Sequence, residues 1–179
     1  MGERFLYFGY GSNMLTERLQ HRCPSAEPYA TAELPGYALA FSKPSSDGSG
    51  KAAPIEHAGG SLHGVLFSIN VDELGTLDRV EGEGTDYKRT LVEVRSTSHS
   101  EPLKAVTYFA MKYAEGFMPF KWYQALVLAG AMQHNLPVHH QDHIKKFPTL
   151  LDPKPNHRSR RAAIKALQMG GFEQLLSDE

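Results

Sequence analysis

The segment that decides the fold is FLYFGYGSNM, residues 5–14. Its first four residues are aromatic or aliphatic, which predicts a buried strand over residues 5–8. Gly9 and Gly11 predict a tight turn directly after that strand. Ser12 and Asn13 are favourable N-cap residues, so we expect a helix to follow the turn and to end before Pro24. Strand, glycine turn and helix in this order can present backbone N–H groups to a ligand.

Beyond this segment the pattern predicts a mixed α+β domain over residues 1–179, with the C-terminal helix, about 157–176, as an appendage. Further strands are expected at residues 37–41, 62–69, 87–95 and 103–111, the last two forming a hairpin. Further helices are expected at residues 70–81, 121–134, 139–146 and near the C-terminus. The first of these has Asn70 and Glu73 spaced as in a capping box, and Gly82 at its end. A turn is expected at residues 34–37, and the Ser, Gly and Pro content of residues 42–60 predicts a mobile loop with a short strand near 52–55.

The composition excludes several classes of protein. The chain has 179 residues, of which 41% are hydrophobic and 22% charged, as expected for one globular domain. Nineteen Lys and Arg residues against twenty Asp and Glu residues give a net charge of −1, which offers no attraction to nucleic acid or to an anionic membrane. A single cysteine, Cys23, excludes an intramolecular disulfide. The absence of a long apolar run or a signal-like start favours a cytoplasmic protein without membrane contact.

The glycine turn does not match the best-known glycine motifs. In a dinucleotide-binding fingerprint the third glycine would fall at Met14, so that match fails. In a nucleophile elbow one residue would separate Gly11 from the serine, but Ser12 follows it directly. The pattern alone supports a ligand-binding loop and a ligand-free tight turn about equally.

Glu81 is the second candidate for chemistry. It lies at the expected C-terminus of the helix over residues 70–81, where the partial negative charge of the helix disfavours a carboxylate. A carboxylate in such a setting suits a general base that works near neutral pH. Glu83 is equally acidic, and local sequence alone favours a solvated turn for both glutamates.

Two other groups of residues give weaker signals. His139 and His143 are spaced i, i+4, as metal ligands on a helix are, but no third ligand follows from the spacing, so no metal site is predicted. Five basic residues between Lys154 and Lys165 predict a solvated helix face, because no aromatic residues are interleaved with them. Tyr123 lies in an apolar helical stripe and could direct its hydroxyl group into a pocket.

Three motifs together give the chain a family resemblance. The segment at residues 5–14, the sequence LDRVEG at residues 77–82 and the later Tyr87 resemble the γ-glutamylcyclotransferase family. Leu136-Pro137 after an Ala/Gly-rich helix also matches, and the resemblance covers roughly residues 5–144. The resemblance implies a small α+β fold with a partly closed, mainly antiparallel β-barrel flanked by helices.

The resemblance also implies an activity and its residues. Members of the family cyclise a γ-glutamyl group to 5-oxoproline and release the attached amino acid or amine, a reaction of γ-glutamyl amino acid and glutathione metabolism that needs no cofactor. Glu81 would be the general acid/base. The implied substrate-binding residues are Tyr10, Gly11, Ser12, Asn13, Met14, Tyr87 and Tyr123.

Other functions stay open at this stage. An enzyme that removes a γ-glutamyl protecting group in a biosynthetic pathway would use the same loop and the same glutamate. A non-catalytic small-molecule-binding module of the same fold would have no need for an acid at Glu81. The expected partner is a small γ-glutamyl substrate, and a homodimer is compatible with the sequence.

Overall fold

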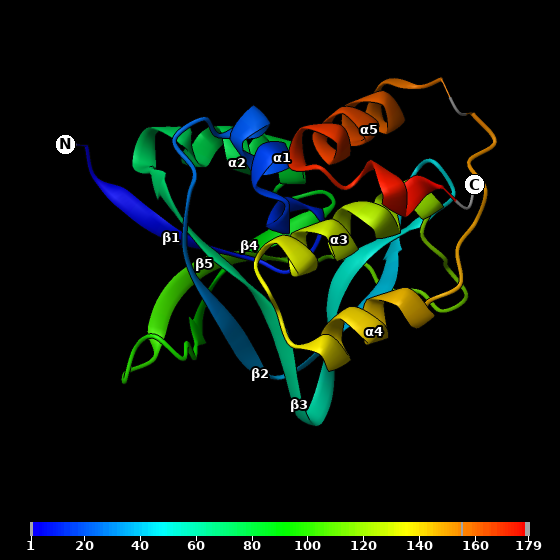
Figure 1. Ribbon diagram of the computed structural model, residues 1–179. Helices are drawn as coiled ribbons and strands as arrows, with labels where there is room; N and C mark the ends of the chain where they lie inside the picture. Colours follow the sequence, from blue (N-terminus) through cyan, green and yellow to red (C-terminus); the bar gives the residue numbers. More distant parts are fainter. Residues whose placement is uncertain (1, 155, 178–179) are drawn as a thin grey trace.

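The computed structural model describes residues 2–154 and 156–177, which form one mixed sheet and a set of helices beside it (Figure 1). The strands are β1 (Arg4–Gly9), β2 (Glu27–Pro44), β3 (Gly50–Asn70), β4 (Tyr87–Val94) and β5 (Leu103–Ala110). The α-helices are α1 (Thr16–Arg22), α2 (Leu74–Glu81), α3 (Lys121–Gln133), α4 (Val138–Lys146) and α5 (Arg158–Gly170). Short 3₁₀ turns are η1 (Ser12–Met14), η2 (Val71–Glu73) and η3 (Glu173–Leu176).

The strand order β2-β3-β1-β5-β4 places the first strand in the middle of the sheet. β1 runs antiparallel to β3, with Phe5 opposite Ile69, and parallel to β5, with Tyr7 opposite Val106. The other neighbouring strands are antiparallel, so the expected mainly antiparallel α+β architecture is confirmed. Because β1 is central, the loop that leaves it at Gly9 emerges over the middle of the sheet.

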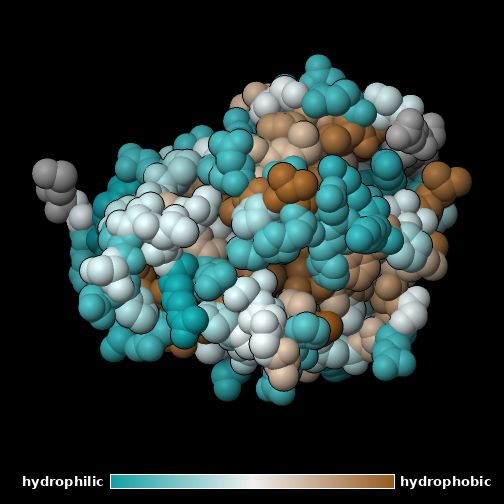
Figure 2. All heavy atoms as spheres, turned by 60° about the horizontal axis from the view of Figure 1, so that its bottom comes forward, coloured by the Kyte–Doolittle hydropathy of each residue, from teal (hydrophilic) through white to brown (hydrophobic). Residues whose placement is uncertain are grey.

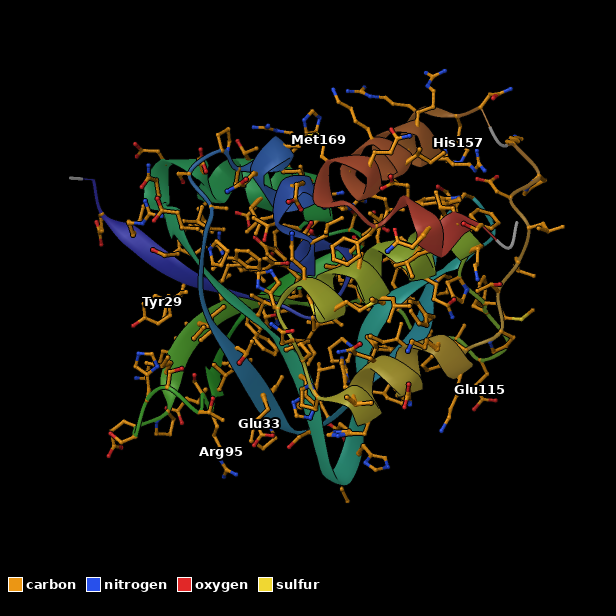
Figure 3. The ribbon with its side chains drawn as sticks, viewed as in Figure 1. Tyr29, Glu33, Arg95, Glu115, His157 and Met169 are labelled. Carbon is orange, nitrogen blue, oxygen red and sulfur yellow. The ribbon has the colours of Figure 1, made fainter. Side chains whose placement is uncertain are left out.

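The expected partly closed barrel is wrong, because the two edges of the sheet are not joined by a ladder. In the described part of the chain, the edge strand β2 meets the end of β4 at an isolated bridge between Glu33 and Arg95. The backbone N–H of each residue donates to the carbonyl of the other, at 2.8 and 2.9 Å, and Figure 3 shows the two residues side by side. The structure is therefore an open five-stranded mixed sheet whose edges touch at this bridge.

The expected mobile loop at residues 42–60 is also wrong. β2 and β3 form a long hairpin, and only residues 45–49 turn the chain between them. The expected turn at residues 34–37 lies inside β2, where the pairing register shifts between Pro35 and Tyr37 and Gly36 has φ +83°. Ser, Gly and Pro reduce local strand preference, but the β2–β3 ladder supplies hydrogen bonds that local composition does not report.

α3 is the most buried helix of the fold, with ten buried residues among its thirteen. It packs against η1, α4 and α5 (Figure 1). At Gly130 the contact with η1 is so close that an added Cβ would lie 2.4 Å from Met14 Cβ and 2.6 Å from Leu15 N. Glycine at this position therefore lets the turn after β1 approach the helix.

The helix ends differ in part from the sequence prediction. Gly82 ends α2 in the left-handed conformation with φ +67°, as expected of a C′ glycine. The prediction of a capping box is wrong. Asn70 makes no side-chain cap, and the Glu73 carboxylate accepts hydrogen bonds from Ser25 instead. The expected C-terminal helix ends early, at Gly171, where φ is +76°, and η3 follows as a separate turn.

The surface is mixed in character. Figure 2 shows apolar side chains on one face as patches among hydrophilic ones. No helix among residues 2–154 and 156–177 is long and apolar enough to cross a membrane.

Candidate active site

A small hollow, partly open to solvent, lies where β1 ends and α2 ends. Side chains and backbone from six separate parts of the chain meet here, which is why no short motif describes the whole site. Its lining residues are Tyr7, Tyr10, Gly11, Ser12, Asn13, Ala52, Glu81, Tyr87, Tyr108 and Tyr123. Seven of the eight residues that the sequence predicts for the site are in this list, and Met14 is not.

The loop after β1 forms one side of the hollow. The Met14 N–H donates to the Gly11 carbonyl at 3.0 Å and closes the 3₁₀ turn η1. The N–H groups of Ser12 and Asn13 precede this bond and, like other groups at the start of a helical turn, have no partner within it. Neither side chain caps α1, which begins at Thr16 after an uncapped Leu15.

Met14 belongs to the core. Its side chain is fully buried and packs against α3 at Gly130. The residue therefore anchors the loop from behind, while its neighbours Ser12 and Asn13 line the hollow.

Glu81 occupies the opposite side, at the last residue of α2, with 16% of its side chain exposed. Asn13 Nδ2 donates to Glu81 Oε1 at 2.7 Å and also to the Tyr7 hydroxyl oxygen at 3.1 Å. One carboxylate oxygen is thus held by the loop, and Glu81 Oε2 has no hydrogen bond to the described residues. This second oxygen is available to accept a proton from a bound ligand.

Arg22, at the end of α1, holds the loop and the glutamate together. Its Nη1 donates to Asn13 Oδ1 at 2.6 Å and lies 3.5 Å from Glu81 Oε1. The guanidinium group fixes which end of the Asn13 amide faces Glu81, because the amide oxygen must accept from Arg22. It also balances the negative charge of a carboxylate that is mostly removed from water.

A second carboxylate on α2 fixes the floor of the hollow. Asp78 Oδ1 accepts from the Tyr108 hydroxyl at 2.7 Å, and Asp78 Oδ2 pairs with Arg89 Nη1 at 2.6 Å. The Tyr10 hydroxyl donates to the backbone carbonyl of Tyr108. Asp78 and Glu81 lie one turn apart on α2. Through its contacts with Tyr108 and Arg89, Asp78 holds the helix against β5 and β4.

The third side of the hollow is built on Ala52 of β3. The Tyr87 hydroxyl donates to the Ala52 carbonyl at 3.0 Å, and the Ala52 N–H donates to the Tyr123 hydroxyl oxygen at 3.2 Å. An added Cβ at Gly11 would lie 2.9 Å from Ala52 Cβ, so the loop and this strand are in close contact. Tyr87 and Tyr123 thus line the hollow, and their role in substrate binding stays a prediction.

The phenols of the hollow stay neutral near neutral pH. Burial, followed by the nearby Glu81 charge, raises the pKa of Tyr7. Burial also raises the pKa values of Tyr10, Tyr87 and Tyr123. None of these tyrosines can therefore serve as a phenolate base near neutral pH, and Glu81 is the carboxylate in the hollow.

Sequence reasoning missed four residues of this site: Tyr7, Arg22, Ala52 and Tyr108. Tyr7 carried a usable signal, because a hydroxyl group inside an otherwise apolar strand requires a partner. Arg22 and Ala52 carried no such signal in the sequence. A basic residue at the end of a helix and a small residue in a strand are both common in proteins without a ligand site.

The other candidates of the sequence lie apart from the site. His139 Nε2 is 3.2 Å from His63 Nε2, whereas His143 Nε2 is 2.9 Å from the Leu39 carbonyl, so the two histidines turn to different partners. Cys23 is fully buried in the core.

Comparisons with known proteins identify the family of the chain. Residues 61–144 match the model of the AIG2-like family. A γ-glutamylcyclotransferase of Bos taurus is 34% identical over 145 residues, which are 78% of this chain and 77% of that protein. The chain belongs to the γ-glutamylcyclotransferase family. The Homo sapiens γ-glutamylcyclotransferase is 32% identical over 149 residues, 80% of this chain and 78% of its own length.

Solved structures of the family show the same fold. A γ-glutamyl cyclotransferase structure superposes with a TM-score of 0.82 at 28% identity, covering 91% of this chain and 99% of its own. The family resemblance stated from the sequence is therefore confirmed.

Proposed function

We propose that this γ-glutamylcyclotransferase family member converts γ-glutamyl compounds to 5-oxoproline and releases the attached amine. The observation that carries the proposal is Glu81 in a partly buried hollow, with Oε1 fixed by Asn13 at 2.7 Å and Oε2 without a hydrogen bond to residues 2–154 or 156–177. The relatives named γ-glutamylcyclotransferase support the same activity.

The reaction begins with a proton transfer. The α-amine of the substrate is protonated near neutral pH and cannot attack until a base removes a proton. Glu81 Oε2 takes that proton, and the free amine then attacks the γ-carbonyl carbon of the same glutamyl group. Because nucleophile and electrophile belong to one molecule, much of the entropic cost of bringing them together is absent; effects of this kind reach about 7–11 kcal/mol.

The loop after β1 is placed to stabilise the charge that develops during ring closure. Negative charge develops on the γ-carbonyl oxygen as the ring closes, and the N–H groups of Ser12 and Asn13 are the donors at hand. Loss of one such donor costs about 2.7–4 kcal/mol in a well-studied protease. The tetrahedral intermediate then breaks its bond to the departing nitrogen, which takes the proton from Glu81. The ring nitrogen loses its second proton to the released amine, so no water is consumed and the carboxylate is restored.

Product identity tests this function. The protein is incubated in H₂¹⁸O with a panel of γ-glutamyl amino acids, γ-glutamyl amines and glutathione, and products are identified by mass. We expect 5-oxoproline without solvent oxygen as the first product, because cyclisation adds no water. Labelled free glutamate as the first product would establish hydrolysis instead and overturn the proposal.

A substrate analogue provides the matched control. N-acetylation of the α-amine removes the nucleophile and leaves the scissile γ-amide unchanged. We expect no release of the leaving group from this analogue. Turnover at a rate comparable with that of the free amine would contradict intramolecular attack.

A further inference from the structure

A second cavity, of about 490 Å³, adjoins the candidate active site. It lies between the turn at residues 45–49, helix α3 and the start of α5. The residues that matter to its chemistry are Arg18, Lys51, Tyr123, Asp152, Lys154 and His157. Its volume falls within the range of cavities that bind drug-sized ligands, about 300–1,000 Å³, and exceeds what one small amino acid needs.

The two cavities share a wall. Tyr123 lines both of them. Lys51 lines the second cavity while the next residue, Ala52, lines the first, because successive side chains of a strand point to opposite faces. Arg18 Nε donates to Ser12 Oγ at 3.1 Å, so this arginine reaches from the second cavity to the substrate loop.

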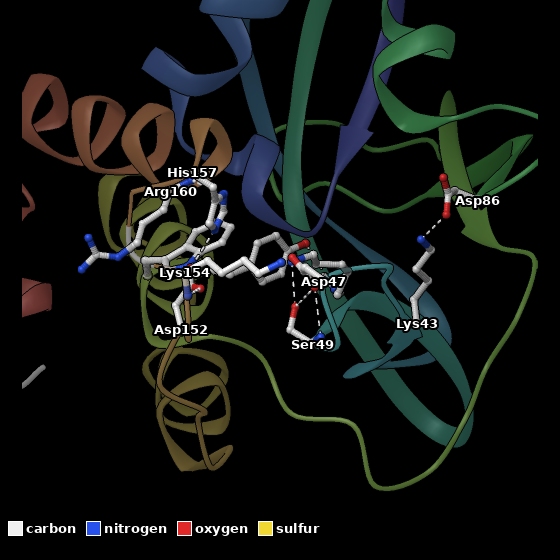
Figure 4. Close-up of polar contacts among 12 residues, drawn as sticks. Lys43, Asp47, Ser49, Asp86, Asp152, Lys154, His157 and Arg160 are labelled. Atoms are coloured by element: carbon white, nitrogen blue, oxygen red, sulfur yellow. Dashed lines mark hydrogen bonds and ion pairs between the residues drawn. The ribbon is translucent and has the colours of Figure 1, made fainter.

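The acidic groups of the second cavity already have partners (Figure 4). Asp47 Oδ2 pairs with Lys51 Nζ at 2.8 Å. Asp152 Oδ2 accepts from Trp122 Nε1 at 2.8 Å and lies 2.7 Å from His157 Nε2. Both carboxylates are thus held by neighbours within the cavity.

Arg18 is different. It donates a hydrogen bond to the neutral Ser12 hydroxyl, and no carboxylate in residues 2–154 or 156–177 pairs with it. Burial, followed by the nearby Arg22, lowers the pKa of Arg18, and the opposing effects of Tyr123 and Glu81 are smaller. Lys154, at the exposed rim, also lacks a carboxylate partner in the same part of the chain. A partly buried arginine without a counter-ion favours an anionic ligand.

We propose that this cavity binds a peptide-like leaving group longer than one residue, and that Arg18 receives its terminal carboxylate. The inference rests on the proposed function, which places the γ-carbonyl beside Ser12 and hence the departing portion next to Arg18. A carboxylate matches the planar guanidinium group, which can donate two parallel hydrogen bonds to it. Arg18 is therefore a specificity-determining residue for the leaving group.

Binding to a variant with the Glu81→Gln substitution tests the proposal without turnover. Isothermal titration compares γ-glutamyl-glycylglycine with its C-terminal amide, two ligands that differ in the terminal charge. We expect the free acid to bind at least about tenfold more tightly, as charge-assisted hydrogen bonds imply. Adding Arg18→Gln should bring the two affinities within about twofold of each other, mainly by weakening the acid, and Arg18→Lys should restore part of the difference.

The controls separate this role from a structural one. Arg161→Gln, on the exposed side of α5, should leave the preference for the acid unchanged. Equal affinities for acid and amide, no binding of either, or equal weakening of both by Arg18→Gln would each overturn the proposal. Release of 5-oxoproline from γ-glutamylalanine by the unsubstituted protein tests the proposed function separately, so failure of one result is distinct from failure of the other.

Discussion

Two sides of the candidate active site are built from different chemistry. The Glu81 side comprises Glu81, Asn13, Arg22 and Tyr7, joined by short hydrogen bonds that include a full negative and a full positive charge. The Ala52 side consists of the Ala52 backbone and the neutral phenols of Tyr87 and Tyr123. Proton transfer requires a group that changes charge, so we expect the Glu81 side to govern rate and the Ala52 side to govern shape.

Among the substitutions that test this division, Glu81→Gln should have the largest effect on rate. An amide cannot accept the ammonium proton, so we expect kcat to fall by about 10²–10⁴-fold while the fold is retained. The measurement is the rate of 5-oxoproline release, with circular dichroism as the check on folding. Glu83→Gln is the matched control, because Glu83 is exposed and should be nearly silent. A rate within tenfold of the unsubstituted protein would remove Glu81 from the mechanism.

Arg22→Gln should have the next largest effect. Arg22 contacts Asn13 and Glu81 and does not line the hollow, so it acts as a positioning residue. Loss of a hydrogen bond from a charged group costs about 1.5–3 kcal/mol, so we expect kcat to fall by at least about tenfold with KM changed far less. Arg79→Gln, an exposed arginine on α2, is the control. An equal rise in KM would instead place Arg22 in substrate binding.

Gly130→Ala tests how the Glu81 side is supported. Alanine normally stabilises a helix interior relative to glycine by about 0.8–1 kcal/mol. Here the new Cβ would meet Met14 Cβ at 2.4 Å and Leu15 N at 2.6 Å, so we expect destabilisation of about 1–3 kcal/mol from overpacking. Gly75→Ala on α2, where a Cβ meets nothing within 4 Å, should be neutral or stabilising. Thermal unfolding measures both, and a raised Tm for Gly130→Ala would contradict the close packing.

Tyr87→Phe should have the smallest effect. It removes the hydrogen bond from the Tyr87 hydroxyl to the Ala52 carbonyl, which is worth about 0.5–1.5 kcal/mol. We expect KM to rise a few-fold and kcat to change little, in steady-state measurements with one γ-glutamyl amino acid. A loss of kcat as large as that of Glu81→Gln would show that the Ala52 side takes part in the chemistry and would end the distinction between the two sides.

The same two sides show what sequence can predict. Local sequence makes Glu81, Gly11, Ser12 and Asn13 candidates, because each lies in a short motif at a turn or a helix end, and only the family resemblance gives them roles in a site. Ala52 was missed because its strand was expected to be a loop. The β2–β3 ladder depends on partners such as Ala40 opposite Ala53, and composition does not encode such pairing.

Local sequence patterns were enough to predict the fold class. They were not enough to predict whether the sheet closes. Alternating residues in β4 and β5 marked them as strands, and the family resemblance implied a barrel. Whether two edges join depends on strand twist and length over the whole sheet. In the described part of the chain, only Glu33 and Arg95 bridge β2 to the end of β4.

The central position of β1 has a consequence for how the chain folds. Phe5–Phe8 precede both of their partners along the chain, because β3 ends at Asn70 and β5 begins at Leu103. During synthesis the aromatic strand must therefore wait until β5 has been made before both of its edges are covered. Such non-local pairing slows folding and exposes an aggregation-prone segment. Refolding rate and yield should accordingly respond more to polar substitutions at Phe5 than to comparable changes at the exposed Leu91 of β4.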